Sequence, residues 1–276
     1  MATLNERNAH PRDEHVSFEA STHTYTIKGS SAGVTSVTTL LDTCFEQFDP
    51  DSVLNQYYTR WQQNPLKNPK YYDKTKDQIK AQWKQEGEEA ARKGTELHDA
   101  IEAHYKGDTR KQGPRTPEWQ HFLAFQREHQ LQACRTEMTV WSEEHKLGGR
   151  VDLVVRGEDG TCALYDWKRA KDQVRKGERH WGRYGKGPLQ GQGVKDNKYY
   201  RYSMQLNLYR ELLERYYGYA VTRMYVVRLH PNAKTFEVTE VERMEEETTA
   251  VLAHRKESVV ESQLRELCIE NKERNE

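Results

Sequence analysis

The sequence has no clustered cysteines. Its four cysteines, at positions 44, 134, 162 and 268, are far apart and form no CxxC pair. A zinc or iron–sulfur site needs several thiolates that are close in space and usually close in sequence. We therefore predict no zinc and no iron–sulfur cluster, and we expect free buried thiols in a reducing compartment.

Long apolar runs are also missing. None approaches the ~20 residues that a transmembrane helix needs. The N-terminal stretch MATLNERNAHPRDEH has no apolar signal-peptide core, and its acidic residues argue against a transit peptide. The sequence thus predicts a soluble intracellular protein with no membrane partner, and its 276 residues are enough to bury a core.

Net charge is zero, because 43 Lys and Arg residues balance 43 Asp and Glu residues. The total gives no hint of a nucleic-acid partner, but the distribution is uneven. Residues 169–201 contain ten basic and three acidic side chains, whereas residues 240–276 contain eleven glutamates and six basic side chains. Local fields of this kind influence binding more than the sum does.

Periodicity and turn residues predict a mixed α/β chain. Helices are expected at about 82–105, where apolar residues recur every four positions, at 117–129, and at 203–217 before Gly218. Strands are expected at 135–144 and 221–229. The predicted organisation is a disordered lead at 1–15, one domain at 16–235 with a basic insertion at about 171–202, and an acidic helical tail at 236–276.

The stretch GGRVDLVVRGEDGTCALYDWK, residues 148–168, predicts a β-hairpin. With a three-residue loop that ends at Gly160, Val155 pairs with Ala163 and Asp152 lies opposite Asp166. Alternation then places Val151, Leu153, Val155, Ala163, Tyr165 and Trp167 on one apolar face, and Asp152, Asp166 and Lys168 on the other.

Two opposed carboxylates repel unless one is protonated or a cation lies between them. Mg²⁺ is typically bound by one or two carboxylates, with water and phosphate oxygens as further ligands. Lys168 points to the same side and could contact a phosphate or a water. The alternative is an ordinary solvated face that carries unrelated charges.

Two helical pairs flank the hairpin in sequence. His98 and Glu102 are four residues apart, and so are Gln205 and Tyr209, so each pair shares a helix face. A His–Glu pair directed at carboxylates could hold a metal, and a Gln–Tyr pair could hold a phosphate or a base. Structural or surface roles are the alternatives, and Glu137 could add a further acid.

In chain order, GTELHDAIE, Glu137, GGRVD, YDWK and QLNLY resemble the motifs of the PD-(D/E)xK nuclease superfamily, in its RecB-like, phage- and virus-type exonuclease branch. The resemblance covers about residues 90–230. It implies a restriction-endonuclease-like core, with a central mixed sheet flanked by helices, and hydrolysis of phosphodiester bonds that depends on Mg²⁺ or Mn²⁺.

The resemblance also implies roles for single residues. His98, Asp152, Asp166 and the backbone carbonyl of Trp167 match metal ligands, and Lys168 matches the catalytic lysine. Gln205 and Tyr209 match a QxxxY element that contacts DNA. Glu137 matches an acidic position of variable role. Glu102 is expected to be an accessory acid on its spacing from His98 alone, not on the resemblance. Trp167 departs from the commoner Tyr, and the connection over 171–202 is longer than usual.

The basic insertion interleaves cations with aromatic residues, a pattern that suits phosphate contact and base stacking. It predicts a clamp for single-stranded DNA or strand ends. The cations expected to bind DNA are Arg175, Lys176, Arg179, Arg183 and Lys186. A disordered, solvated loop is the alternative.

The leading hypothesis is thus a DNA exonuclease or end-processing enzyme of replication, recombination or repair. A catalytically inactive nucleic-acid-binding module that keeps the fold is the runner-up, and a small-molecule hydrolase comes third. The sequence leaves open exonuclease against endonuclease, polarity, DNA against RNA, one metal against two, and the oligomeric state.

Overall fold

The computed structural model describes residues 2–108, 113, 115–157, 159–177 and 182–273. The chain divides into two compact units, one formed by Gln47–Leu97 and the other by Met1–Glu46 with His98–Glu276. Among the described residues, no helix combines the length and the apolar character that crossing a membrane requires.

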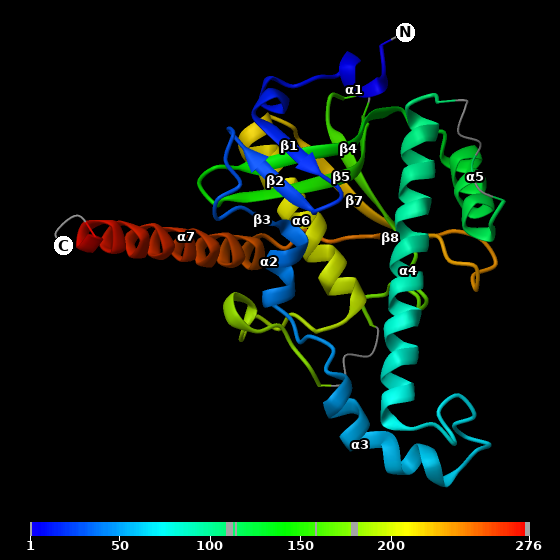
Figure 1. Cartoon of the computed structure of the whole chain (residues 1–276). Helices are drawn as coiled ribbons and strands as arrows, with labels where there is room; N and C mark the ends of the chain where they lie inside the picture. The colour runs from blue at the N-terminus through cyan, green and yellow to red at the C-terminus, as the bar shows by residue number, and fades with distance from the viewer. Residues whose placement is uncertain (1, 109–112, 114, 158, 178–181, 274–276) are drawn as a thin grey trace. The chain divides into compact units, whose positions relative to one another are not determined.

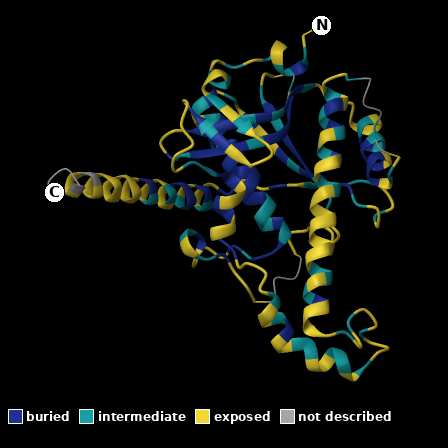
Figure 2. Ribbon diagram, in the orientation of Figure 1, coloured by how far each residue is buried: buried dark blue, intermediate teal, exposed yellow. Residues whose placement is uncertain are grey.

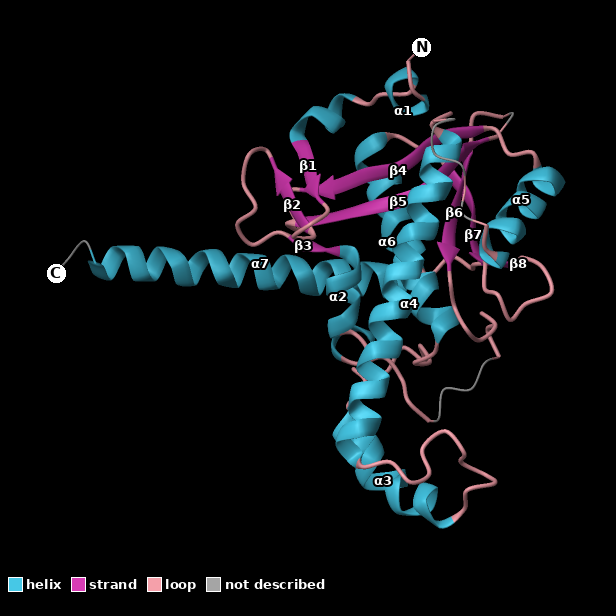
Figure 3. Cartoon of the chain, turned by 45° about the vertical axis from the view of Figure 1, so that its right-hand side comes forward, coloured by secondary structure: helices cyan, strands magenta, loops and turns pink. Residues whose placement is uncertain are grey.

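A mixed sheet forms the centre of the larger unit (Figures 1 and 3). Its order is β3-β5-β6-β7-β8, and β4 pairs with the other edge of β5. The β5–β6, β7–β8 and β4–β5 pairs are antiparallel, whereas β6–β7 and β3–β5 are parallel. The strands are β3 Thr35–Ser36, β4 Ala133–Ser142, β5 Leu147–Arg156, β6 Cys162–Lys168, β7 Val221–Arg228 and β8 Glu237–Glu240.

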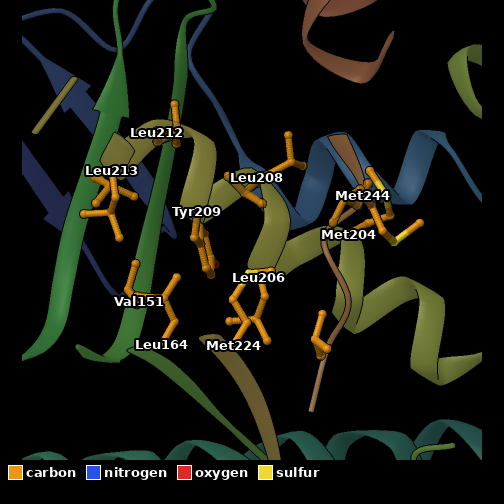
Figure 4. Close-up of a cluster of buried hydrophobic side chains, with 14 of the residues drawn as sticks. Val151, Leu164, Met204, Leu206, Leu208, Tyr209, Leu212, Leu213, Met224 and Met244 are labelled. Atoms are coloured by element: carbon orange, nitrogen blue, oxygen red, sulfur yellow. The ribbon is translucent and has the colours of Figure 1, made fainter. Parts of the chain in front are cut away.

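Helix α6, Lys198–Tyr217, packs against one face of this sheet. Its N-terminus is capped by the Asn197 side chain and it ends at Gly218, whose φ of 69° suits glycine. Apolar side chains on several sides of α6 are buried, as expected for a core helix. Leu206 and Tyr209 of α6 face Val151 and Leu164 of the sheet in the main apolar cluster (Figure 4).

Helix α5, Pro117–His129, covers strand β6 from the other side. Thr116 caps it and Pro117 occupies its first turn. The rings of Phe122 and Phe125 lie 5.6 and 5.4 Å from the Trp167 ring, which is 1% exposed. Strand β6, which carries Asp166 and Lys168, is therefore packed between α5 and α6. The predicted mixed α/β fold with a central sheet flanked by helices is confirmed.

The remaining elements complete the larger unit. A two-stranded sheet pairs β1, Val16–Glu19, with β2, Thr24–Ile27. Ser36 caps helix α2, Val37–Thr43, which packs on α6. Cys44, Cys134 and Cys162 are buried as expected, but Cys268 is exposed.

The smaller unit contains α3, Pro50–Gln63, and the first part of α4, Lys76–Tyr105. Leu54 and Ile79 are fully buried. An aromatic cluster supplements them, in which the Trp61 and Tyr71 rings lie 4.5 Å apart and Trp83 Nε1 donates to the Tyr71 hydroxyl.

The prediction of a disordered lead at 1–15 is wrong for residues 2–15. Helix α1, Leu4–Arg7, and a 3-10 helix, Pro11–His15, form there. The Asn5 side chain exchanges two hydrogen bonds with the backbone of Thr136, and the Arg12 guanidinium lies 3.8 Å from the centre of the Trp141 ring. These partners lie about 130 residues away, so local sequence could not reveal them.

The prediction of an acidic helical tail at 236–276 is also partly wrong. Strand β8 extends the central sheet, and only then does α7, Glu245–Glu273, begin. The first half of α7 is packed, because Val251 and Leu252 are buried and Arg255 donates to the carbonyls of His145 and Lys146. The later turns of α7 are exposed, as Figure 2 shows.

Candidate active site

The predicted hairpin register is confirmed. Val155 pairs with Ala163 and Leu153 with Tyr165. The Gly157 N–H donates to the Thr161 carbonyl at 2.7 Å, and Gly160 has a φ of 81°. A non-glycine residue would be strained at that φ. The register makes Asp152 and Asp166 the next opposed pair.

Beyond Leu153 the two strands separate, and the Asp152 side chain occupies the opening. Its Oδ2 accepts a hydrogen bond from the Trp167 backbone N–H at 2.7 Å. On the edge of β5 that faces β3 and β6, residues 147–148 pair with β3 and residues 153–156 pair with β6. Residues 149–152 therefore have no ladder partner on that edge. The carboxylate thus takes the place of a backbone acceptor.

One predicted face assignment is wrong. Val151 belongs to the cluster of Val154 and Leu164 rather than to the face of Leu153 (Figure 4). Strict alternation fails where the backbone of the neighbouring strand departs from strand geometry. Glu137, which lies between the residues paired to Leu153 and Val151, has a φ of 47°.

His98, on α4, joins this opening from the larger unit. Its Nε2 lies 2.9 Å from the Trp167 carbonyl oxygen, and its Nδ1 lies 3.6 Å from both Glu137 Oε1 and Asp152 Oδ2. Since a carbonyl only accepts, Nε2 must carry a hydrogen. The ring is therefore oriented with Nδ1 directed at two carboxylates.

His98, Glu137 and Asp152 form a group whose ligand atoms all lie within 4.8 Å of one another. Arg150 stands beside it, with Nη2 3.1 Å from Glu137 Oε2 and 3.8 Å from Glu102 Oε1. Glu102 thus belongs to the Arg150 side of the site, outside the three-residue group.

Asp166 and Lys168 form the other half of the site. Lys168 Nζ lies 3.0 Å from Asp166 Oδ1 and 2.8 Å from Oδ2, and Gln205 Nε2 donates to Oδ1 at 3.3 Å. Asp166 is 1% exposed, and its Oδ2 is buried without a hydrogen bond. Among the described residues, the Lys168 amine is the one group that forms an ion pair with this oxygen.

The charged groups of the site shift one another's pKa values. Burial lowers the pKa of His98, but the carboxylates of Asp152 and Glu137 raise it more, to about 9. Burial raises the pKa of Asp152, and it raises that of Asp166 to about 6 despite the opposing effect of Lys168. Burial lowers the pKa of Lys168, but Asp166 and Asp152 raise it above its ordinary value. The buried carboxylates of Asp152 and Asp166 and the partly buried one of Glu137 thus share three cations, His98, Lys168 and Arg150.

A sequence model of the PD-(D/E)XK nuclease superfamily matches residues 51–273. The chain belongs to this superfamily. The match spans most of the chain and includes every candidate residue of the site.

Solved structures resemble this superfamily member only distantly. The protein SSO0001 shares 16% identity at a TM-score of 0.35, over 83% of this chain and 78% of that chain. An alkaline exonuclease from Laribacter hongkongensis shares 12% identity at 0.39, over 86% and 94%. Neither likeness is close enough to assign a property to this chain. No curated protein matches it in sequence.

The donor set fits the divalent cation that superfamily members use. Carboxylate oxygens and an imidazole nitrogen suit Mg²⁺ or Mn²⁺, and a cation there would replace the proton that the two carboxylates favour on His98 Nδ1. His98 would bind through Nδ1 while its Nε2–H donates to the Trp167 carbonyl, an arrangement common for metal-bound histidine. The buried Asp166 Oδ2 offers a further oxygen.

The structure brings together only part of the metal-ligand set that the sequence predicts. Glu137 rather than Asp166 completes the three-residue group, and the Trp167 carbonyl is engaged by His98. Asp166 and the Trp167 carbonyl as direct ligands stay predictions.

The expected contact of Tyr209 with DNA does not fit its burial. Tyr209 is 3% exposed, and its hydroxyl accepts a hydrogen bond from Gln205 at 3.1 Å. A Cβ placed on Gly149 would lie 2.5 Å from its ring, so glycine is needed for this close packing. Tyr209 therefore supports Gln205, which in turn contacts Asp166.

The four described cations expected to bind DNA contact different parts of the chain. Lys176 is paired with Glu242 at 2.6 Å, and Lys186 lies 4.0 Å from Glu46. Arg175 is exposed and lines a separate groove. Arg183 is exposed near the bridge between Tyr184 and Lys195, and Arg179 lies outside the described residues.

Sequence reasoning missed two residues. Arg150, inside GGRVD, contacts Glu137, and the Tyr202 ring centre lies 5.0 Å from Lys168 Nζ. Both carried a signal: Arg150 is two residues from Asp152 on the same strand. Tyr202 precedes Gln205 by three positions, so the two share a helix face.

Proposed function

We propose that this chain is a deoxyribonuclease that hydrolyses phosphodiester bonds with Mg²⁺ or Mn²⁺ and acts on single strands or DNA ends. Its role would lie in replication, recombination or repair. The observation that carries the proposal is the convergence of His98, Glu137 and Asp152 next to the buried Asp166–Lys168 pair.

A divalent cation at this site would lower the pKa of a water nucleophile and offset charge on the phosphate. Within the chain, Asp152 has one oxygen fixed by the Trp167 N–H, so its carboxylate is oriented before any ligand arrives. His98 is oriented in the same way by the Trp167 carbonyl. Such preorganisation reduces the ordering needed in the transition state.

Lys168 is assigned to positioning and charge stabilisation. Burial lowers the pKa of the Lys168 amine, but Asp166 and Asp152 raise it more, so the ammonium form is favoured. An ammonium group can donate to a phosphate oxygen and to the attacking water. Gln205 donates a hydrogen bond to Asp166 and so helps to position the Lys168 amine that pairs with Asp166.

The test is cleavage of end-labelled linear DNA and of covalently closed DNA, with Mg²⁺, Mn²⁺ or EDTA. We expect metal-dependent loss of the linear substrate and no loss of the closed one. Asp166→Ala should abolish cleavage and leave DNA binding in EDTA largely intact. Cutting of closed circles would make the enzyme an endonuclease. Salt-sensitive binding without cleavage of any substrate would favour the inactive binding module.

A further inference from the structure

A polar groove of about 930 Å³ lies beyond the catalytic strand. One wall comes from the segment that follows β6 and includes Lys171 and Arg175. The other comes from the β7–β8 connection and includes Lys234. We propose that this groove binds the sugar-phosphate backbone of the DNA strand whose end occupies the active site, an inference that rests on the proposed function.

The free charge in the groove is positive. Its acidic residues are already paired, Glu237 with Arg228 at 3.0 Å and Asp172 with Lys198 at 2.6 Å. Lys171, Arg175 and Lys234 are exposed and form no ion pair with any residue that the structure describes. Three uncompensated cations around one groove attract a polyanion.

The two walls are fastened to each other. Buried Arg228 donates to the carbonyls of Ala170 and Lys171, and Asn232 also donates to the Lys171 carbonyl. Gln173 donates to Glu237 across the walls at 3.1 Å. Because these bonds hold both segments, the groove is formed before a ligand arrives, which lowers the cost of binding.

The groove starts close to the catalytic lysine. Lys171 is three residues beyond Lys168, and the Lys168 carbonyl accepts from the Leu229 N–H at 2.9 Å. Strands β6 and β7 are parallel, so the two wall segments both begin at the carboxyl ends of these strands. Ligands of open α/β sheets bind outside the carboxyl ends of strands. A strand end at Asp166 and Lys168 could thus continue into the groove.

The test measures DNA affinity by fluorescence anisotropy with single-stranded DNA in EDTA, across a series of KCl concentrations. Each phosphate contact to a single strand contributes ~0.7 to the salt slope. Lys171→Gln/Lys234→Gln should therefore reduce the magnitude of that slope by about 1.4 and weaken binding about tenfold at low salt. Each single variant should give about half the slope change.

Lys272→Gln is the matched control. Lys272 is an exposed lysine on α7, outside the groove, and its replacement makes the same charge change as either single variant. It should leave affinity and slope as in the wild type. If the double variant behaves like this control while the wild type binds and cleaves DNA, the groove inference is wrong and the proposed function stands. If the wild type neither binds nor cleaves, the proposed function itself fails.

A competition arm separates a strand from a small phosphate ligand. The inhibition constant of deoxyadenosine monophosphate should be the same for the wild type and the double variant, because a single phosphate makes too few contacts along the groove to depend on Lys171 and Lys234. A tighter inhibition constant for the wild type would make the groove a mononucleotide site and overturn the assignment to a DNA backbone.

Discussion

Asp152 shows how one side chain serves both the fold and the site. Its Oδ2 accepts the Trp167 N–H at the point where the β5–β6 ladder ends, and the same oxygen lies 3.6 Å from His98 Nδ1. Removing this carboxylate would leave a buried N–H unsatisfied, a cost of ~1–3 kcal/mol. Loss of activity on replacement of Asp152 would therefore mix chemistry with folding.

Glu137 gives a cleaner test at the level of one residue. Glu137→Gln keeps the shape but removes a charge from the group with His98 and Asp152. We expect the Mg²⁺ concentration for half-maximal cleavage to rise about tenfold or more. Glu102→Gln is the matched control, since Glu102 lies outside this group and should shift the Mg²⁺ requirement little. Equal shifts in the two variants would remove Glu137 from the metal site.

Much of the site could be predicted from sequence because the signals are local. The turn residues set the hairpin register, and the register brings Asp152 opposite Asp166. The four-residue spacing of Gln205 and Tyr209 predicted a shared helix face, and on that face the two side chains are hydrogen-bonded. The part played by Glu137 could not be predicted, because its φ of 47° and its approach to His98 depend on tertiary packing.

At the level of elements, the close approach of α6 to β5 positions Gln205. Gly149 permits it, since an added Cβ would lie 2.5 Å from Tyr209 Cε1 and 3.1 Å from Val37 Cγ2. Both neighbours belong to buried elements and have little room to move.

We therefore expect Gly149→Ala to lower the free energy of unfolding by about 1–3 kcal/mol and to reduce cleavage by displacing Tyr209. Urea denaturation measures the first effect. Gly87→Ala is the control, because nothing lies within 4 Å of a Cβ there and a helical alanine is favoured by roughly 0.5–1 kcal/mol. An undiminished stability of Gly149→Ala would show that α6 can move without cost.

Element types were easier to predict than element partners. Helix α5 occupies 117–129 as predicted, because its cap, its proline and its aromatic spacing are local signals. The ordered N-terminal segment and strand β8 escaped prediction for the opposite reason. Asn5 imitates a strand neighbour for β4, and β8 is defined by its pairing with β7.

For the whole molecule, periodicity and turn residues predicted a mixed α/β chain, and the order of the motifs resembled the superfamily; both predictions are confirmed. Neutral total charge did not prevent local excess of one sign, as the groove of Lys171, Arg175 and Lys234 illustrates. The division into two units was not predicted, since α4 runs through the boundary without a break.

The central claim is that Lys168 and the acidic group beside it form a metal-dependent nuclease site. The most direct measurement compares cleavage of end-labelled linear DNA by the wild type and Lys168→Ala, with Mg²⁺ and with EDTA. The account predicts cleavage by the wild type with Mg²⁺ alone and no cleavage by Lys168→Ala, which should still bind DNA. Cleavage at the wild-type rate by Lys168→Ala, or cleavage by the wild type in EDTA, would contradict it.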